Sequence, residues 1–378
     1  MYCCGLVRTL CLFGILGIPG ACSTPGPSPA EWEAHELPKV ELDAEARARV
    51  GSQTEAARQA LAGGRVTEAA RIAERVLRID PRAALARAIL GTALLEPAFA
   101  KTPPDLGWLE RAEGELRLAR RLAPEDSQIA MLYSRFLEVD GQISLAAKVV
   151  DEVLDASPNY LQALRDGSRL HYELGHERQA ALILERLVDR VPSDAEARYR
   201  LAVCQFRLAE AMASGDTEIR VGVRSIAQAA FLRSADSYVT YTRLQPTDMD
   251  GFLGEAMARF RAAVLSSPEP TKQSPAPAAY AEIVAILTSA ARVRPESPSP
   301  IHNQAVVHQH FGNQDKARSC YEAALELDKN FLPSMLNLAV LLDAAGEKPA
   351  ARDLCERALK LKPSDSEAQR LRAYLSLK

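Results

Sequence analysis

Two neighbouring stretches of the chain decide the fold: residues 141–158 read GQISLAAKVVDEVLDASP, and residues 175–192 read GHERQAALILERLVDRVP. Each begins with Gly, carries Ala five residues later and ends on Pro twelve residues after that Ala. An apolar stretch lies between the Ala and the Pro. The second stretch starts 34 residues after the first, so the chain contains an internal repeat.

The same spacing extends over most of the chain. Four of the seven intervals between the residues that close the repeats equal 34, and the other three exceed 34 by 9, 15 and 20 residues. The sequence therefore predicts about eight repeats. The closing residues are Pro81, Pro124, Pro158, Pro192, Pro246, Pro295, Lys329 and Pro363.

Each repeat is expected to form two antiparallel helices. Alanine at the eighth, twentieth and twenty-seventh positions lets the two helix axes approach closely. Proline at the thirty-second position ends the second helix and sets the turn into the next repeat. Glycine at the fifteenth position ends the first helix, which predicts a positive φ that glycine adopts without strain. These glycines are Gly64, Gly141, Gly175, Gly312 and Gly346.

The repeat resembles the tetratricopeptide repeat, whose period is about 34 residues. Leu90-Gly91-x-x-Leu94 stands where that family has Leu-Gly-x-x-Tyr, and so does Leu338-Ala339-x-x-Leu342. The resemblance implies an all-α fold, a right-handed α-solenoid of about eight helical hairpins. It covers residues 50–365, and residues 366–378 are expected to form a capping helix with one apolar face.

Three repeats are longer than the others, with their extra residues near 96–104, 213–233 and 266–279, between the first and the second helix. The first insertion reads as a loop, and the third is rich in Pro and Ser. The second is partly helical in character, so longer helices are the alternative to a loop there. All three are expected on one edge of the solenoid, either as tolerated surface loops or as loops that bind a partner.

The N-terminus differs from everything that follows. Residues 10–18 form an apolar run that is too short for a bilayer, which needs about 20 residues, but suits an export signal. Two small residues and Cys22 follow and resemble a lipobox, the lipidation site of bacterial lipoproteins, although Pro19 stands where Leu is usual. We expect a lipoprotein-type signal peptide over residues 1–22, a lipid on Cys22 and a flexible Pro- and Ser-rich tether and lead-in over residues 23–49. Ordinary signal-peptide cleavage and a retained anchor are the alternatives.

Composition and motifs point away from enzymes and from nucleic acid. The formal net charge of −3 lacks the basic excess of a nucleic-acid binder. The sequence has no phosphate-binding Gly loop, zinc-ligand spacing or G-x-S-x-G motif. Its histidine cluster is spread along a helix, which disfavours a metal site. We therefore expect no catalytic residue, no metal and no cofactor. The clustered histidines are His302, His308 and His310.

Three cysteines lie in the repeats, namely Cys204, Cys320 and Cys355. They form no C-x-x-C motif and no even-numbered framework. Buried free thiols are expected. A disulfide between Cys320 and Cys355, which lie 35 residues apart on equivalent helices, is the alternative.

In the tetratricopeptide family the first helices line a concave face, with repeat positions 2, 5, 9, 12 and 13 directed into it. Arginines beside aromatic residues at these positions suit a peptide with acidic or carboxyl-terminal groups. The alternative is that the arginines pair with nearby Glu and Asp. The Lys and Asn set of the chaperone-adaptor carboxylate clamp is absent. Mapped onto the third to fifth repeats, the groove candidates are Arg135, Gln162, Arg165, Arg169, Tyr172, Tyr199 and Phe206.

Taken together, these features predict a non-catalytic scaffold or adaptor lipoprotein that binds other proteins or peptides in an envelope assembly of the pilus, secretion or gliding-motility type. Ser23 rather than Asp follows Cys22, which favours an outer-membrane lipoprotein facing the periplasm. The alternatives are a regulatory subunit of an envelope enzyme and a soluble adaptor with the same repeats. No nucleic-acid partner is expected.

Overall fold

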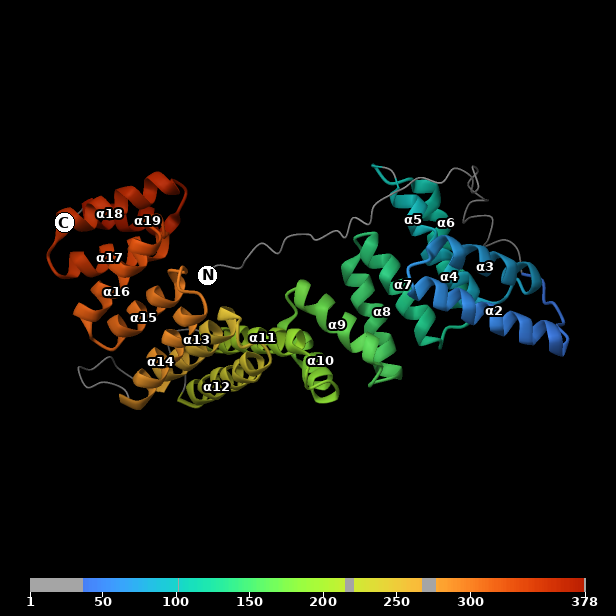
Figure 1. The fold of residues 1–378 in the computed structure, drawn as a ribbon, viewed down its shortest axis with the longest axis horizontal. Helices are drawn as coiled ribbons and strands as arrows, with labels where there is room; N and C mark the ends of the chain where they lie inside the picture. Colours follow the sequence, from blue (N-terminus) through green and yellow to red (C-terminus); the bar gives the residue numbers. More distant parts are fainter. Residues whose placement is uncertain (1–36, 101, 215–220, 267–276, 377–378) are drawn as a thin grey trace. The chain divides into compact units, whose positions relative to one another are not determined.

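The computed structural model describes residues 37–100, 102–214, 221–266 and 277–376 (Figure 1). These residues form helices and no strand, which confirms the all-α prediction. They divide into two compact units, Met1–Gly141 and Gln142–Lys378. Within each unit, consecutive helices pack on one another as hairpins. Among the described helices, none combines the length and the apolar character that crossing a membrane requires.

The described part of the first unit contains two helical hairpins and two further helices, α5 and α7. α2 packs on α3, and α4 packs on both α6 and α7, while the short α5 lies against α6. The alternation of first and second helices is that of the predicted repeats. In chain order the helices are α2 (Ala44–Ala62), α3 (Val66–Ile79), α4 (Ala84–Ala93), α5 (Leu95–Phe99), α6 (Leu106–Leu122) and α7 (Ser127–Val139).

The second unit continues the array to the end of the chain. α9 packs on α10, α11 on α12, α13 on α14, α15 on α16 and α17 on α18, and α19 lies against α18 and α17. Its helices are α8 (Ile143–Ala156), α9 (Leu161–Glu173), α10 (Glu177–Arg190), α11 (Ala195–Ala213), α12 (Val221–Leu244), α13 (Met249–Ser266), α14 (Pro277–Val293), α15 (Ser299–His310), α16 (Gln314–Leu327), α17 (Leu332–Ala344), α18 (Lys348–Leu361) and α19 (Ser366–Ser376).

The closing prolines sit in β-turns that lead from one hairpin into the next element. At every one of these turns the carbonyl of the first residue accepts a hydrogen bond from the N–H of the fourth. Proline occupies the second turn position at all of them except Lys329, and its fixed φ suits that position. The role predicted for the closing residues is confirmed. The turns span residues 80–83, 123–126, 157–160, 191–194, 245–248, 294–297, 328–331 and 362–365.

The glycines at the end of the first helices have the predicted left-handed backbone. Their φ values lie between 72° and 84°. A Cβ at these glycines would meet no atom within 4 Å, so the backbone conformation, and not a lack of space, requires glycine there. After four of the five glycines the next N–H bonds back to a carbonyl five residues earlier, as in a Schellman motif. The glycines are Gly64, Gly141, Gly175, Gly312 and Gly346.

Small residues occupy the eighth repeat position in every repeat, and all of them are buried. Alanine, serine and glycine share this role. At Gly91 there is no space for a side chain, because a Cβ there would lie 2.8 Å from Leu116 Cγ. Close approach of helices therefore depends on side-chain size at this position. The residues are Ala57, Gly91, Ser134, Ser168, Ala202, Ala256, Ala305 and Ala339.

The boundaries differ from the sequence-based expectation at two places. α2 begins at Ala44, inside the stretch 23–49 assigned to the tether and lead-in. Asp43 starts this helix because its Oδ1 accepts a hydrogen bond from Ala46 N at 2.7 Å. In the insertion near 96–104, which reads as a loop, α5 forms because its buried Ala98 packs toward α6.

The other two insertions are flanked by long helices. α11 has 19 residues and α12 has 24, against 13 and 14 in α9 and α10. Much of the stretch 213–233 is therefore helix, although residues 215–220 lie outside the described chain. α13 and α14 have 18 and 17 residues, and most of the stretch 266–279 also lies outside the described residues.

Candidate interaction surface on α9 and α11

Four of the predicted groove residues lie on one face of α9, the first helix of its hairpin. Gln162, Arg165, Arg169 and Tyr172 follow one another at intervals of three, four and three residues. Residues three and four apart are neighbours on a helix surface. The structure therefore brings these four side chains into one row.

Both arginines of this row pair with carboxylates of the chain. Arg165 Nη2 lies 3.6 Å from Asp194 Oδ2, and Arg169 Nη1 lies 3.1 Å from Glu173 Oε1. Asp194 also caps α11, because its Oδ1 accepts a hydrogen bond from Ala197 N. The pairing with nearby acids, which the sequence left open as an alternative, is present. The Arg165 side chain is still 48% exposed.

Tyr172 is flanked by two arginines from the next first helix. The Cζ atoms of Arg200 and Arg207 lie 5.9 and 5.3 Å from the Tyr172 ring centroid, within the range of cation–π attraction. Arg207 Nη1 also lies 3.3 Å from Glu177 Oε1 at the start of α10. The five side chains that join α9 to α11 are called the α9–α11 surface below. They are Arg165, Arg169, Tyr172, Arg200 and Arg207.

Tyr199 and Phe206, also predicted for the groove, contact rings of the second helix of their own hairpin. The Tyr199 centroid lies 5.1 Å from that of Tyr241 on α12, and the Phe206 centroid lies 5.2 Å from that of the buried Phe231. Aromatic pairs at these separations stabilise packing beyond the area they bury. Both residues therefore take part in the packing of α11 on α12, and they are only half-buried.

Two predicted residues stand apart from this row. Arg135 lies on α7 in the first unit, where it is exposed. Cys22, the predicted lipidation site, lies outside the described residues.

Arg200 and Arg207 are the members of the α9–α11 surface that the sequence did not yield as candidates. Arg207 falls at the thirteenth position of the fifth repeat, which is one of the concave-face positions. The repeat numbering could therefore have identified Arg207 as a groove candidate. Arg200 falls at the sixth position and lies seven residues before Arg207, two helical turns away on the same face. Its approach to Tyr172 depends on how α9 and α11 pack.

The three clustered histidines lie among aromatic residues. His302 Nδ1 lies 2.9 Å from Ser334 Oγ, and His308 Nδ1 lies 2.8 Å from the hydroxyl of Tyr280. Burial lowers the pKa of all three imidazoles, that of His302 to about 4. Within the described ranges, no group of three or more His, Cys, Asp or Glu side chains is placed to hold a metal ion.

The three cysteines of the repeats are free thiols, so the alternative disulfide between Cys320 and Cys355 is not formed. Cys204 is buried, and burial raises the pKa of its thiol to about 12. A thiol that stays protonated at neutral pH is a poor nucleophile. Cys204 therefore serves the packing of α11.

Two parts of the chain match family models described as tetratricopeptide repeat, over residues 166–216 and 310–375. No curated protein matches the chain. Among solved structures, a tetratricopeptide repeat protein from Parabacteroides merdae is 15% identical, with 76% of this chain and 99% of that chain covered and a TM-score of 0.46.

Two further structures are similar at the same level. The C-terminal part of a repeat-containing protein from Cytophaga hutchinsonii is 14% identical, with 84% of this chain and 98% of that chain covered and a TM-score of 0.42. YrrB, described as a TPR protein with an unusual peptide-binding site, is 12% identical, with 58% of this chain and 95% of that chain covered and a TM-score of 0.41.

The first family match begins at α9 and includes the whole of α11, and the second covers α16 to α19. The hairpins around both show the helix lengths, the turn glycines and the closing prolines of the repeat. Repeats of this kind act as scaffolds for interactions between proteins. The chain contains tetratricopeptide repeats.

Proposed function

We propose that this protein is a non-catalytic scaffold that is tethered to a bacterial envelope membrane through a lipid on Cys22 and holds other envelope proteins together. The apolar run over residues 10–18, the small residues before Cys22 and the Pro- and Ser-rich residues after it support the tether. On this proposal the chain is an outer-membrane lipoprotein that faces the periplasm and serves a pilus, secretion or gliding-motility type of assembly.

The α9–α11 surface is the observation that carries the proposed binding role. It presents Arg200 and Arg207 beside the Tyr172 ring and Arg165 and Arg169 on the same face of α9. These residues lie on two consecutive first helices, which are the helices that tetratricopeptide proteins use for peptides. Arginine and tyrosine are the residue types most enriched at the energetic centres of protein interfaces. A guanidinium also binds a carboxylate through two parallel hydrogen bonds.

The ion pairs of this surface do not prevent such binding. Exposed pairs contribute about 0–1 kcal/mol, because water screens them and two long side chains must be held in place. The side chains are 48% and 19% exposed in the Arg165–Asp194 pair and 26% and 47% exposed in the Arg169–Glu173 pair, so both pairs are partly open to solvent. A partner's carboxylate can therefore replace the chain's own at small cost. The partner we propose is an acidic segment or carboxyl terminus of another envelope protein.

The experiment that tests this function is the intact mass of the protein extracted from membranes, combined with affinity capture of its companions, for the wild type and for Cys22→Ala. A lipid mass on the wild type, absent from the variant, and a set of envelope proteins captured with the wild type are expected. An unmodified N-terminus with cytosolic companions would instead favour a soluble adaptor. Co-purification of one enzyme with altered turnover would favour a regulatory subunit.

A further inference from the structure

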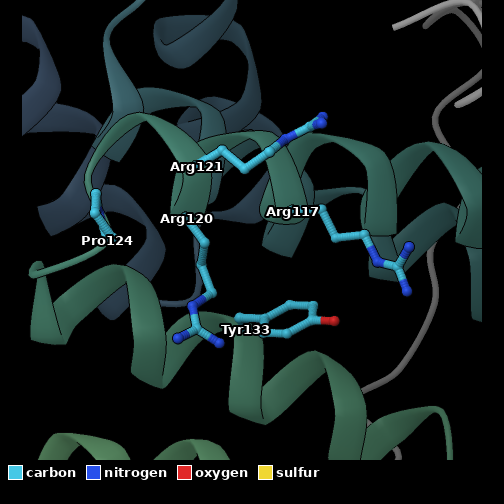
Figure 2. A pocket seen from close by; sticks show the side chains of 5 residues that line it. All are labelled: Arg117, Arg120, Arg121, Pro124 and Tyr133. Atoms are coloured by element: carbon cyan, nitrogen blue, oxygen red, sulfur yellow. The ribbon is translucent and has the colours of Figure 1, made fainter. Parts of the chain in front are cut away.

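A pocket of about 470 Å³ lies between α6 and α7 in the first unit, well separated in the sequence from the α9–α11 surface. Three arginines, one proline and one tyrosine line it (Figure 2). No carboxylate is among these lining residues. The residues are Arg117, Arg120, Arg121, Pro124 and Tyr133, and they are called the α6–α7 pocket below.

The arginines come from the end of a single helix. Arg120 and Arg121 follow Arg117 by three and four residues, so the three charges lie close together on α6. Figure 2 shows Arg120 extending toward the Tyr133 ring and Arg117 extending past the hydroxyl end of Tyr133, whereas Arg121 extends away from the ring. In this view Arg120 and Arg117 lie on either side of Tyr133, which comes from α7, and all three line the pocket.

Contacts within the unit hold these side chains in place. The Cζ atom of Arg120 lies 5.5 Å from the centroid of the Tyr133 ring, a cation–π arrangement. Arg117 Nε lies 2.9 Å from Glu113 Oε1 one turn earlier on α6. Tyr133 itself is only 8% exposed and belongs to the core of the unit. A buried ring thus positions Arg120, which lowers the entropy that ligand binding would cost.

Packing alone does not account for three arginines here. Like charges three and four residues apart on a helix destabilise it by a few tenths of a kcal/mol each. The carbonyl end of α6 offsets part of this repulsion for the last-turn residues Arg120 and Arg121. Arg117 and Arg121 remain exposed and add little to the core. The cluster concentrates positive charge beside a concave, partly aromatic surface, which is the composition of an anion site.

We propose that the α6–α7 pocket binds an aspartate or glutamate side chain of an acidic peptide segment in a partner protein. This inference rests on the proposed function in one respect, namely that the ligand is a protein. Arg117 and Arg120 provide the guanidinium donors for the carboxylate. Tyr133 and Pro124 provide apolar contacts for the peptide residue next to it. The chain's net charge of −3 lacks the basic excess typical of a nucleic-acid binder, so a short acidic peptide is the better fit.

The pocket is distinct from the inner face used in the first proposal. Arg117, Arg120 and Arg121 occupy positions 25, 28 and 29 of the second repeat, which belong to the second helix of the hairpin. The α9–α11 surface consists of first-helix residues of later repeats. One protein would then offer an acidic partner two contact sites, one in each unit.

The test uses the purified full chain and a fluorescent hexaglutamate peptide that is blocked at both ends, with binding followed by fluorescence anisotropy. The double variant Arg117→Gln with Arg120→Gln is expected to weaken binding by on the order of tenfold or more, as two charge-assisted hydrogen-bonding groups are lost. The matched control is Arg71→Gln with Arg75→Gln, which also removes two positive charges. Both arginines are exposed on α3, which like α6 is the second helix of a hairpin in the first unit. The control is expected to change binding less than about twofold.

Four outcomes would overturn the proposal. The first is that hexaglutamate does not bind the wild type. The second is that the pocket variant and the control variant lose binding equally. The third is that inorganic phosphate displaces the labelled peptide as effectively as unlabelled hexaglutamate does, which would make the site a general anion site. The fourth is binding of phosphatidylglycerol vesicles, abolished by the pocket variant, in the absence of peptide binding.

A second variant covers the case in which the glutamine pair disturbs folding. Arg120→Lys keeps the charge but loses the planar group over Tyr133, so weaker peptide binding with an unchanged melting temperature is expected. Unchanged peptide binding in Arg120→Lys would remove Arg120 from the site. Because the peptide is added to purified protein, this test is separate from the membrane experiment. Loss of the Cys22 lipid there would leave the peptide result unaffected.

Discussion

The chain contains two kinds of arginine–carboxylate pair, and they differ in burial. In the first unit, Arg87 on α4 and Glu115 on α6 are 6% and 3% exposed, with Nη1 and Oε2 2.7 Å apart, and Arg87 Nε donates a hydrogen bond to the carbonyl of Pro81. In the second unit, the Arg165–Asp194 and Arg169–Glu173 pairs of the α9–α11 surface are partly open to solvent.

The difference shows that pair chemistry alone does not assign a role. Burial raises the pKa of the Glu115 carboxyl, and the Arg87 guanidinium opposes that rise, so neither charge can be removed without leaving the other unpaired in the interior. The exposed pairs lose little when they open, because water solvates both groups. The buried pair is therefore structural, whereas the exposed pairs are available to a partner.

The strongest test of this contrast is Arg87→Met, which keeps an unbranched apolar side chain, removes the guanidinium and leaves Glu115 without it. We expect it to reduce the free energy of unfolding by about 3–5 kcal/mol. Urea unfolding followed by circular dichroism measures the change. The double variant Arg87→Met with Glu115→Leu should regain most of the loss, because apolar residues replace both charges. If Arg87→Met reduces the free energy of unfolding by less than about 1 kcal/mol, the buried pair is no more important for stability than the exposed pairs.

A buried group that the protein keeps neutral sharpens the contrast. Burial lowers the pKa of His302 to about 4, against an ordinary value of 6.5. Between these two pH values the unfolded chain binds a proton that the folded chain does not. Stability should therefore fall as the pH drops from 6.5 to 4, by about 3 kcal/mol from this residue, and then level off.

The measurement for His302 is the free energy of unfolding against pH for the wild type and for His302→Gln. Glutamine does not titrate, so the difference between the two curves isolates the imidazole. His308 and His310, whose pKa values are also lowered, remain in both proteins. Parallel curves would mean that His302 is accessible to protons in the folded state.

The contrast between buried and exposed positions extends to neighbouring alanines of α18. Ala351 is fully buried where α17 and α18 meet, whereas Ala350 is exposed. Ala351→Leu should overpack the hairpin and cost about 1–3 kcal/mol. Ala350→Leu should stay within about 0.5 kcal/mol of the wild type. Equal melting temperatures for the two variants would contradict the repeat register.

The smallest effect on stability is expected at the α9–α11 surface. Arg165→Ala with Arg169→Ala should change the free energy of unfolding by less than about 1 kcal/mol, since the two ion pairs it removes are partly open to solvent. The same variant should capture markedly less partner protein in pull-down. The matched control is Arg178→Ala with Arg190→Ala, two exposed arginines of α10. Undiminished capture by the first variant would place the contact elsewhere.

The sequence was most informative where one residue type satisfies one backbone requirement. The spacing of glycines such as Gly175 and prolines such as Pro192 predicted the hairpins, the left-handed turn residues and the closing turns. It did less well at the start of the array, where Asp43 caps a helix ahead of the first repeat position. It also missed α5, whose five residues are too few to show a periodic pattern.

The candidate sites were harder to predict, because they depend on contacts between helices. The numbering of the repeat located Arg165, Arg169 and Tyr172 on one face of α9. It could not show that Arg200 reaches Tyr172 from α11, nor that Tyr199 contacts rings of α12. The α6–α7 pocket was missed because its arginines lie on a second helix, outside the positions that line the groove in the family.

The junctions of this array differ in how much length they accept. Between consecutive hairpins of the second unit the helices are separated by four or five residues throughout, as in 191–194 and 328–331. Inside the hairpins the separation ranges from the three residues at 311–313 to the stretch between Ser266 and Pro277. Residues can therefore be inserted or deleted between the two helices of a hairpin while the packing of one hairpin on the next stays unchanged.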